Sequence, residues 1–200
     1  MNRTDRTVQV IREGGVVLIA TDTVYGLAAL PANREAVSKI YRLKERPENM
    51  FLPIMVADRN DLEKLGLDIN RIAGKLFKSE LVPGAVTFIL GFKDESLKPS
   101  WLQGREEIAV RIPDNRLLLS VLRKTGPLLV TSANRHGFPH TPGHVKEILK
   151  ELNGSPDLIV EDGEGKEIPS TIINCRHNPP VIERLGLISS DIINKILQDE

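Results

Sequence analysis

Apolar residues recur along this chain either in short continuous runs or at helical spacing. The run at 16–20 is β-branched and continuous, which is typical of a strand buried on both faces. Similar runs predict strands at 54–57, 85–92, 107–112, 128–131, 158–160, 171–174 and 181–184. Helical spacing predicts helices at 4–13, 34–43, 58–66, 70–81, from Asp114 to Gly126, and at 190–198. Strands and helices alternate without repeats or linkers. We therefore predict one α/β domain over residues 1–200, with a twisted, mixed parallel and antiparallel open sheet flanked by helices.

Composition and charge argue against several classes of protein. Lysine plus arginine and aspartate plus glutamate both number 27, so the formal net charge is zero. This balance argues against a protein that coats RNA, because neutralisation of phosphates needs a basic excess. The single cysteine, Cys175, excludes an internal disulfide. The polar first segment and the short apolar runs predict a cytoplasmic protein that contacts no membrane.

The segment that follows the first strand contains Thr21, Asp22 and Thr23. In α/β sheets, ligands bind beyond the carboxyl ends of strands, so these polar side chains are suited to a small polar ligand. The same residue types also form hydrogen-bonded turns without any ligand. The pattern alone leaves both interpretations open.

Two cations, Lys44 and Arg46, stand at the end of the second predicted helix, before Pro47. Proline turns the chain there, so both side chains can point to one place and bind a polyphosphate. From the residues alone, a solvated helix end that complements the helix dipole is favoured instead.

Two further candidates lie at predicted strand ends. Arg111 stands in an apolar strand, where an arginine either pairs with an internal acid or binds an anionic ligand group. Ser132 and Asn134 follow another strand and either orient a ligand or cap a turn.

Other motifs are weaker. His136, His140 and His144 are spaced four apart, but the intervening glycines and prolines forbid the helix that a metal site of this spacing needs. A P-loop is absent, so a nucleotide would not be held in the Walker manner.

Seven motifs, in order along nearly the whole chain, resemble the YrdC-like family of threonylcarbamoyl-AMP synthases, in its single-domain form. They are TDTVYGL (21–27), IYRLKERP (40–47), PGAVTFIL (83–90), AVRIP (109–113), TSAN (131–134), PSTIIN (169–174) and ERLGLIS (183–189).

The resemblance implies a nucleotidyltransferase that makes threonylcarbamoyl-AMP and diphosphate from L-threonine, bicarbonate and ATP, with magnesium. A separate tRNA-modifying transferase complex would then use the product to make threonylcarbamoyladenosine, and a weak contact with tRNA is conceivable. By resemblance the catalytic residues are Lys44, Arg46, Ser132 and Asn134, and the ATP-binding residues are Lys44, Arg46, Asn134 and Arg184. The threonine-binding residues are Thr21, Thr23, Arg111, Ser132 and Ser170. The magnesium ligands cannot be named from the sequence.

The sequence departs from the family pattern at Ala20, at 49–53 and at 135–137. The last change puts His136 or His140 in the place of a nucleotide contact. An alternative function is an RNA-binding or ribosome-maturation paralogue that uses the same concave cleft without synthase activity.

Overall fold

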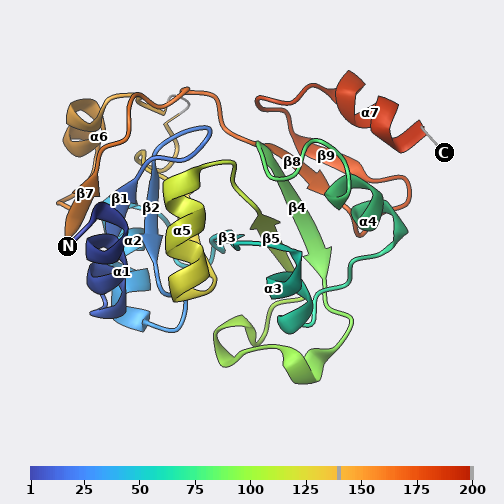
Figure 1. Cartoon of the computed structure of the whole chain (residues 1–200), viewed down its shortest axis with the longest axis horizontal. Coiled ribbons are helices and arrows are strands. Elements are labelled where there is room, and N and C mark those ends of the chain that lie inside the picture. The colour runs from blue at the N-terminus through green and yellow to red at the C-terminus, as the bar shows by residue number, and fades with distance from the viewer. Residues whose placement is uncertain (139–140, 199–200) are drawn as a thin grey trace.

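The computed structural model describes residues 1–138 and 141–198, and within them nine strands form one sheet. The strand order is β7-β1-β2-β6-β3-β5-β4-β8-β9, so the sheet is open at β7 and β9 (Figure 1). Three neighbouring pairs are parallel and the others are antiparallel. The predicted α/β class with a mixed open sheet is confirmed. The strands are β1 Val17–Ile19, β2 Gly26–Ala29, β3 Ile54–Met55, β4 Val86–Gly91, β5 Glu107–Arg111, β6 Leu128–Ser132, β7 Leu158–Val160, β8 Thr171–Asn174 and β9 Val181–Arg184.

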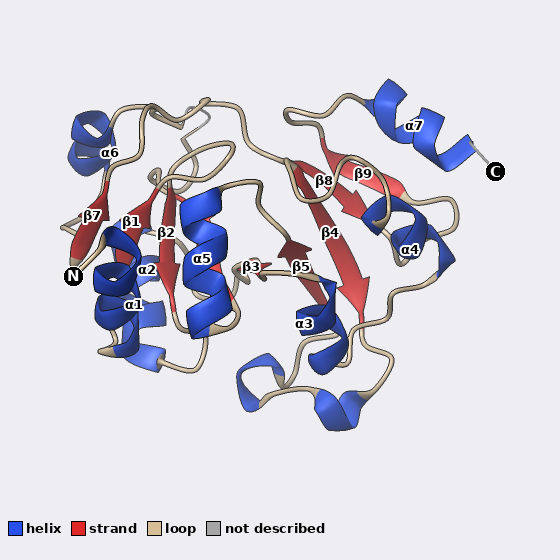
Figure 2. Cartoon of the chain, in the orientation of Figure 1, coloured by secondary structure: helices blue, strands red, loops and turns tan. Residues whose placement is uncertain are grey.

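Helices pack on both faces of this sheet (Figure 2). Val8 of α1 and Leu118 of α5 pack with Val17 and Ile19 of β1 on one face. Ile40 of α2 and Ile148 of α6 belong to the larger apolar cluster on the opposite face. The helices are α1 Arg3–Arg12, α2 Arg34–Lys44, α3 Arg59–Lys64, α4 Arg71–Phe77, α5 Arg116–Thr125, α6 Val145–Glu151 and α7 Ser190–Gln198, with 3-10 turns at Glu95–Leu97 and Ser100–Leu102.

Helix caps explain several boundaries. The Asn33 side chain caps α2 by accepting a hydrogen bond from the amide of Ala36 (3.0 Å). Asn115, and not the predicted Asp114, caps α5 by accepting from the amide of Leu118 (2.9 Å). The helix predicted over 70–81 ends at Phe77, where α4 terminates.

Two elements escaped the sequence patterns. Gly26, Leu27, Ala28 and Ala29 have weak strand propensity, yet they form β2 because β1 and β6 pair with them on both sides. At Gly26 a Cβ atom would lie 2.7 Å from the Val130 side chain, so the close pairing with β6 needs glycine. The second element, α6, is a two-turn helix whose single fully buried side chain gives little periodic signal.

In the described part of the chain, no helix combines the length and apolar character needed to cross a membrane.

Candidate functional site

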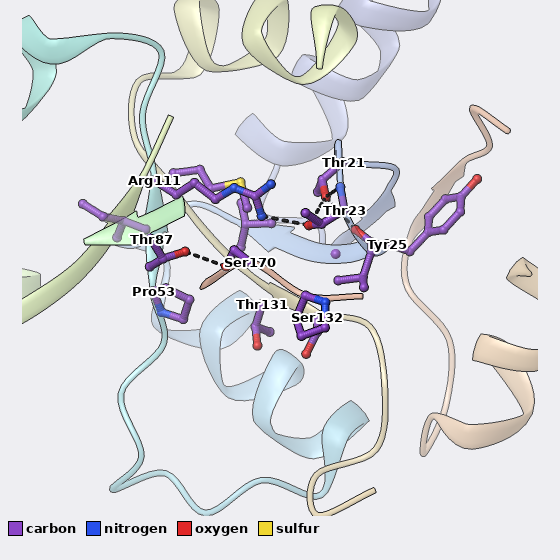
Figure 3. Close-up of a pocket in the computed structure, with 15 residues that line it drawn as sticks. Thr21, Thr23, Tyr25, Pro53, Thr87, Arg111, Thr131, Ser132 and Ser170 are labelled. Carbon is purple, nitrogen blue, oxygen red and sulfur yellow. Dashed lines mark hydrogen bonds between the residues drawn. The ribbon is translucent and has the colours of Figure 1, made fainter. Parts of the chain in front are cut away.

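A pocket forms where the polar motifs of both halves of the sheet meet (Figure 3). The sheet order makes this possible: β1 and β6 are both antiparallel to β2, so they run in the same direction. The turn after β1 and the end of β6 therefore lie at the same end of the sheet, as predicted. The pocket is lined by Thr21, Thr23, Val24, Tyr25, Gly26, Pro53, Ile54, Met55, Thr87, Arg111, Val130, Thr131, Ser132, Pro169 and Ser170.

All five residues predicted to bind threonine line this pocket, although they come from separate parts of the sequence. The four residues predicted to bind ATP, three of which were also predicted to be catalytic, do not line it: Lys44, Arg46, Asn134 and Arg184. The pocket volume is about 60 Å³. Because each water molecule takes up roughly 30 Å³ of liquid, an amino acid would have to extend beyond this space or displace lining side chains.

The turn after β1 is held by its own hydroxyl groups. Thr21 Oγ1 donates to the carbonyl of Val24 (2.7 Å) and accepts from the amide of Thr23 (3.1 Å). The interpretation of this segment as a hydrogen-bonded turn is therefore confirmed. The turn does not exclude a ligand-binding role, because Thr21 and Thr23 both line the pocket. Ala20, where the family pattern differs, is buried and does not open the turn.

Arg111, at the end of β5, crosses to this turn. Its guanidinium donates to Thr23 Oγ1 (2.8 Å) and to the Gly84 carbonyl (2.9 Å), and it forms an ion pair with Asp22 (2.7 Å). The side chains of Arg111 and Asp22 are only 5% and 10% exposed. Burial lowers the pKa of Arg111, and the charge of Asp22 opposes this shift.

Of the two interpretations of Arg111, the internal acid is thus confirmed. Asp22 is a residue whose partnership the sequence did not reveal. The sequence did contain a clue to this pair: an acid in a turn that follows a buried strand, and an arginine in a second buried strand. The predicted contact of Arg111 with a threonine carboxylate stays a prediction. Arg111 lines the pocket, so its guanidinium can take part in both interactions.

Lys44, the last residue of α2, is buried, which makes the solvated helix end wrong for this residue. Its ammonium group donates to the carbonyls of Ser132 and Asn134, and to Asn134 Oδ1 at 3.2 Å. The same Oδ1 accepts from Ser132 Oγ (2.7 Å). Desolvation, assisted by the nearby charge of Arg46, lowers the pKa of Lys44 to about 7. Lys44, Ser132 and Asn134 therefore form one hydrogen-bonded unit, and their shared catalytic role stays a prediction.

Arg46 does not join this unit. Its guanidinium donates to the carbonyls of Met50 and Phe51 (both 3.2 Å), so it braces the loop that follows α2. Lys44 and Arg46 thus bond to different segments, although the charge of Arg46 lowers the pKa of Lys44. A contact of Arg46 with phosphate stays a prediction.

The opposite wall comes from β4 and β8. The hydroxyl groups of Thr87 and Ser170 are hydrogen-bonded (2.7 Å), and Arg184 donates to the Ser170 carbonyl (2.9 Å). Thr87 is a lining residue that the sequence analysis did not single out, although it lies in the motif at 83–90. Arg184 thus supports the wall from outside the pocket.

The described histidines are separated. The His136 amide donates to the Lys44 carbonyl (2.8 Å), so its backbone joins the loop after β6 to α2. His144 begins α6, and its Nδ1 is 3.7 Å from a carboxylate oxygen of Glu164. His140 lies outside the described residues. A nucleotide contact of His136 or His140 stays a prediction.

Magnesium binds mainly to carboxylate oxygens, phosphates and water. Among residues 1–138 and 141–198, no group of three or more histidine, cysteine or acidic side chains could hold a metal ion. Asp22, which lies in the turn between the lining residues Thr21 and Thr23, is paired with Arg111. The described residues therefore form no protein cage for magnesium, and an ion that accompanies ATP would depend on phosphates and water for its ligands.

The comparisons with known proteins decide the family. A family model named Sua5_yciO_yrdC and described as "Telomere recombination" matches residues 9–186. The chain belongs to the Sua5/YciO/YrdC family.

Several relatives share most of this chain. The threonylcarbamoyl-AMP synthase of Bacillus subtilis is 37% identical over 189 residues, which are 94% of this chain and 54% of that protein. A putative threonylcarbamoyl-AMP synthase of Methanocaldococcus jannaschii is 36% identical, with 89% of this chain and 83% of the relative covered. The chain thus spans about half the length of the B. subtilis relative.

Solved structures of family members agree with the fold. The structure of Sua5 from Pyrococcus abyssi complexed with L-threonine superposes with a TM-score of 0.86 at 31% identity, and it covers 98% of this chain and 57% of that protein. YciO from Escherichia coli gives a TM-score of 0.82 at 28% identity, with 93% of this chain and 90% of YciO covered. The resemblance found in the seven motifs is confirmed at the level of family and fold.

Proposed function

We propose that this chain is an L-threonylcarbamoyladenylate synthase, which converts L-threonine, bicarbonate and ATP to threonylcarbamoyl-AMP and diphosphate. The observation that carries the proposal is the convergence of Thr21, Thr23, Arg111, Ser132 and Ser170 on one pocket. The names of the B. subtilis and M. jannaschii relatives and the threonine complex of P. abyssi Sua5 support it.

The reaction needs two bond-forming steps. The amino group of threonine attacks the carbon of bicarbonate, and loss of water leaves a carbamate. A carbamate oxygen then attacks the α-phosphorus of ATP, and the bond to the β-phosphate oxygen breaks to release diphosphate. Both steps depend on the alignment of reactants and on the stabilisation of negative charge.

The Arg111 end of the pocket is suited to the amino acid. The guanidinium is buried and fixed by Asp22 and Thr23, so its orientation is set before a carboxylate arrives. Pre-orientation of this kind lowers the entropic cost of binding. In this proposal the threonine carboxylate approaches Arg111, and the amino group lies toward Ser132.

The Lys44 end is suited to the phosphates. Lys44 is a buried cation whose hydrogen-bond partners are carbonyl oxygens, and no carboxylate of the described residues forms an ion pair with it. The charge of Glu151, which is not paired with Lys44, raises the pKa of Lys44 against the larger effect of burial. A phosphate would supply the missing negative charge and favour the protonated ammonium group. Ser132 and Asn134 lie between the two ends and would contact the reacting groups.

The downstream steps belong to the same proposal. The product would pass to a tRNA-modifying transferase complex for synthesis of threonylcarbamoyladenosine, in the cytoplasm. Magnesium would enter with ATP.

The test is release of diphosphate from ATP with bicarbonate, measured with and without L-threonine. We expect release that depends on L-threonine and is at least tenfold slower with L-valine, which has the same shape without the hydroxyl group. Lys44→Ala should reduce the rate by about 10²–10³, as loss of an oxyanion donor does. Release that is no faster with threonine than without it would exclude the synthase and favour the RNA-binding alternative.

A further inference from the structure

A second pocket opens on the α2 side of the molecule and shares no lining residue with the candidate site. Its volume is about 410 Å³, which is typical of a small-molecule site. The residues that give it chemical character are the aromatic side chains Tyr41, Phe51 and Trp101, the cations Arg34 and Arg105, and the acid Glu48. We refer to it as the aromatic–arginine pocket.

This pocket lies apart from the proposed phosphate end. Arg34 opens α2 and Tyr41 lies just over two turns along it, and both line this pocket, whereas Lys44 ends the helix and does not line it. The loop at 47–53 separates the two sites: Phe51 lines the aromatic–arginine pocket and Pro53 lines the candidate site. The same loop carries one of the departures from the family pattern, so the pocket contains features particular to this chain.

The aromatic side chains offer a stacking surface. Phe51 is 55% exposed, which is unusual for a large apolar ring, and it presents one face to the Arg105 guanidinium at 4.2 Å. Tyr41 is buried beneath them, and its hydroxyl donates to the Met50 carbonyl (3.1 Å). Trp101, the single tryptophan of the chain, stands on the facing 3-10 turn.

The charge of the pocket favours an anion. Neither Arg34 nor Arg105 forms an ion pair with a carboxylate anywhere in the described residues. Desolvation lowers the pKa of Arg105, so this cation is only partly hydrated. The charges of Arg105 and Arg46 both lower the pKa of Tyr41 against the larger effect of burial, whereas Glu48 raises it. Two cations and one acid therefore line the pocket, and the acid, Glu48, is exposed.

We propose that the aromatic–arginine pocket is a second binding site, separate from the synthase site, for a nucleoside phosphate. The base stacks between Phe51 and Trp101, and the phosphate pairs with Arg34 and Arg105. Glu48 accepts hydrogen bonds from the ribose hydroxyls. Stacking on aromatic rings together with arginine contacts to phosphate is how proteins commonly hold nucleotides without a P-loop.

The single tryptophan provides the test, because its fluorescence reports on this pocket directly. We expect titration of the full chain with AMP to quench Trp101 saturably, and ribose 5-phosphate to bind at least tenfold more weakly because it has no base. A 5′-phosphorylated trinucleotide of adenosine distinguishes the source: tighter binding than AMP indicates the end of an RNA, and weaker binding indicates a free nucleotide. Both results support recognition of a nucleoside phosphate.

Variants locate the binding site. Arg105→Gln and Arg34→Gln should each weaken AMP binding about tenfold, as expected for loss of a charge-assisted hydrogen bond. Arg34 is exposed, so this variant leaves the fold intact even if Arg105→Gln disturbs the loop. Arg42→Gln removes the same charge from an exposed position on α2 that does not line the pocket, and it should not change the affinity.

Lys44→Ala separates this proposal from the synthase. Quenching should persist in Lys44→Ala, while threonine-dependent diphosphate release is lost. Absence of quenching with every nucleotide would overturn the second site and leave the synthase proposal untouched. Quenching that disappears in Lys44→Ala and survives in Arg34→Gln and Arg105→Gln would also overturn it, because the signal would then come from the synthase site.

Discussion

Two buried cations, Arg111 and Lys44, serve the candidate site and have different partners: Arg111 lines the pocket, and Lys44 contacts the carbonyl of the lining residue Ser132. Arg111 is paired with the carboxylate of Asp22 at 2.7 Å. Lys44 is surrounded by neutral oxygen atoms from Ser132 and Asn134. Both are almost fully removed from water, so burial disfavours both charges, but only one of them is neutralised inside the protein.

The two cations are therefore suited to different tasks: Arg111 orients a ligand, and Lys44 supplies positive charge. At the Arg111 end, the ion pair fixes a guanidinium whose net charge is already balanced, which suits recognition of shape and hydrogen bonding. At the Lys44 end, the charge of Glu151 offsets the desolvation only in part and the pKa falls to about 7, so an incoming anion restores the proton. The four predictions below test this contrast, from the largest expected effect to the smallest.

Removal of one partner of the buried ion pair should have the largest effect. Asp22→Ala leaves the Arg111 charge buried without a counter-charge, and we expect the free energy of unfolding to fall by about 3–5 kcal/mol in urea titrations. The double variant Asp22→Leu/Arg111→Met, which removes both charges, should recover most of this loss. A cost below about 1 kcal/mol for Asp22→Ala would mean that water reaches this end of the site.

The low pKa of Lys44 should make the free energy of unfolding depend on pH. The pKa of Lys44 in the folded protein, about 7, is below the ordinary lysine value of 10.5. Between these values the unfolded chain binds more protons than the folded one, so stability rises with pH. From pH 7 to pH 9 the free energy of unfolding should rise by about 2 kcal/mol in the wild type relative to Lys44→Met.

Lys44→Met is itself the control for that measurement, since the other titrating groups are common to both proteins. Parallel pH profiles for the two proteins would show that Lys44 keeps an ordinary pKa. The contrast with Arg111 would then disappear.

A smaller effect is expected at the wall beside Arg111. Ser170→Ala removes the hydrogen bond to Thr87 (2.7 Å) and leaves a buried hydroxyl group without this partner. The free energy of unfolding should fall by about 1–2 kcal/mol, as measured by thermal or urea unfolding. Thr87→Val with Ser170→Ala should cost less than the two single changes added together. Simple additivity would argue against a direct bond.

The smallest effect is expected for an exposed ion pair at the Lys44 end. Arg135 pairs with Glu45, and both side chains are well exposed. Arg135→Ala should change the free energy of unfolding by about 0–1 kcal/mol, and less at high salt. A loss comparable to that of Asp22→Ala would mean that burial does not govern the difference between the two ends.

Much of the fold and of the family was readable from the sequence. Continuous β-branched runs such as 16–20 predict buried strands wherever they occur, because they bury both faces of a sheet. The missed strand, β2, depends on neighbours: Gly26–Ala29 has little propensity of its own and is ordered by β1 and β6. The polar motifs after the strands predicted ligand-binding residues at strand ends. The structure brings these motifs to one end of the sheet because β1 and β6 run in the same direction.

The sequence by itself determined which residue types were available: two hydroxyl-bearing motifs, an arginine in an apolar strand and a lysine at a helix end. Only the tertiary structure decided which of the charged residues form an ion pair. Asp22 and Arg111 are far apart in the chain, and their pairing depends on β5 lying within reach of the turn after β1. Lys44 looked like a solvated helix end because local sequence does not encode burial. Burial follows from the way the loop after β6 closes over α2, and long-range packing of this kind sets both the pKa of Lys44 and its availability to a phosphate.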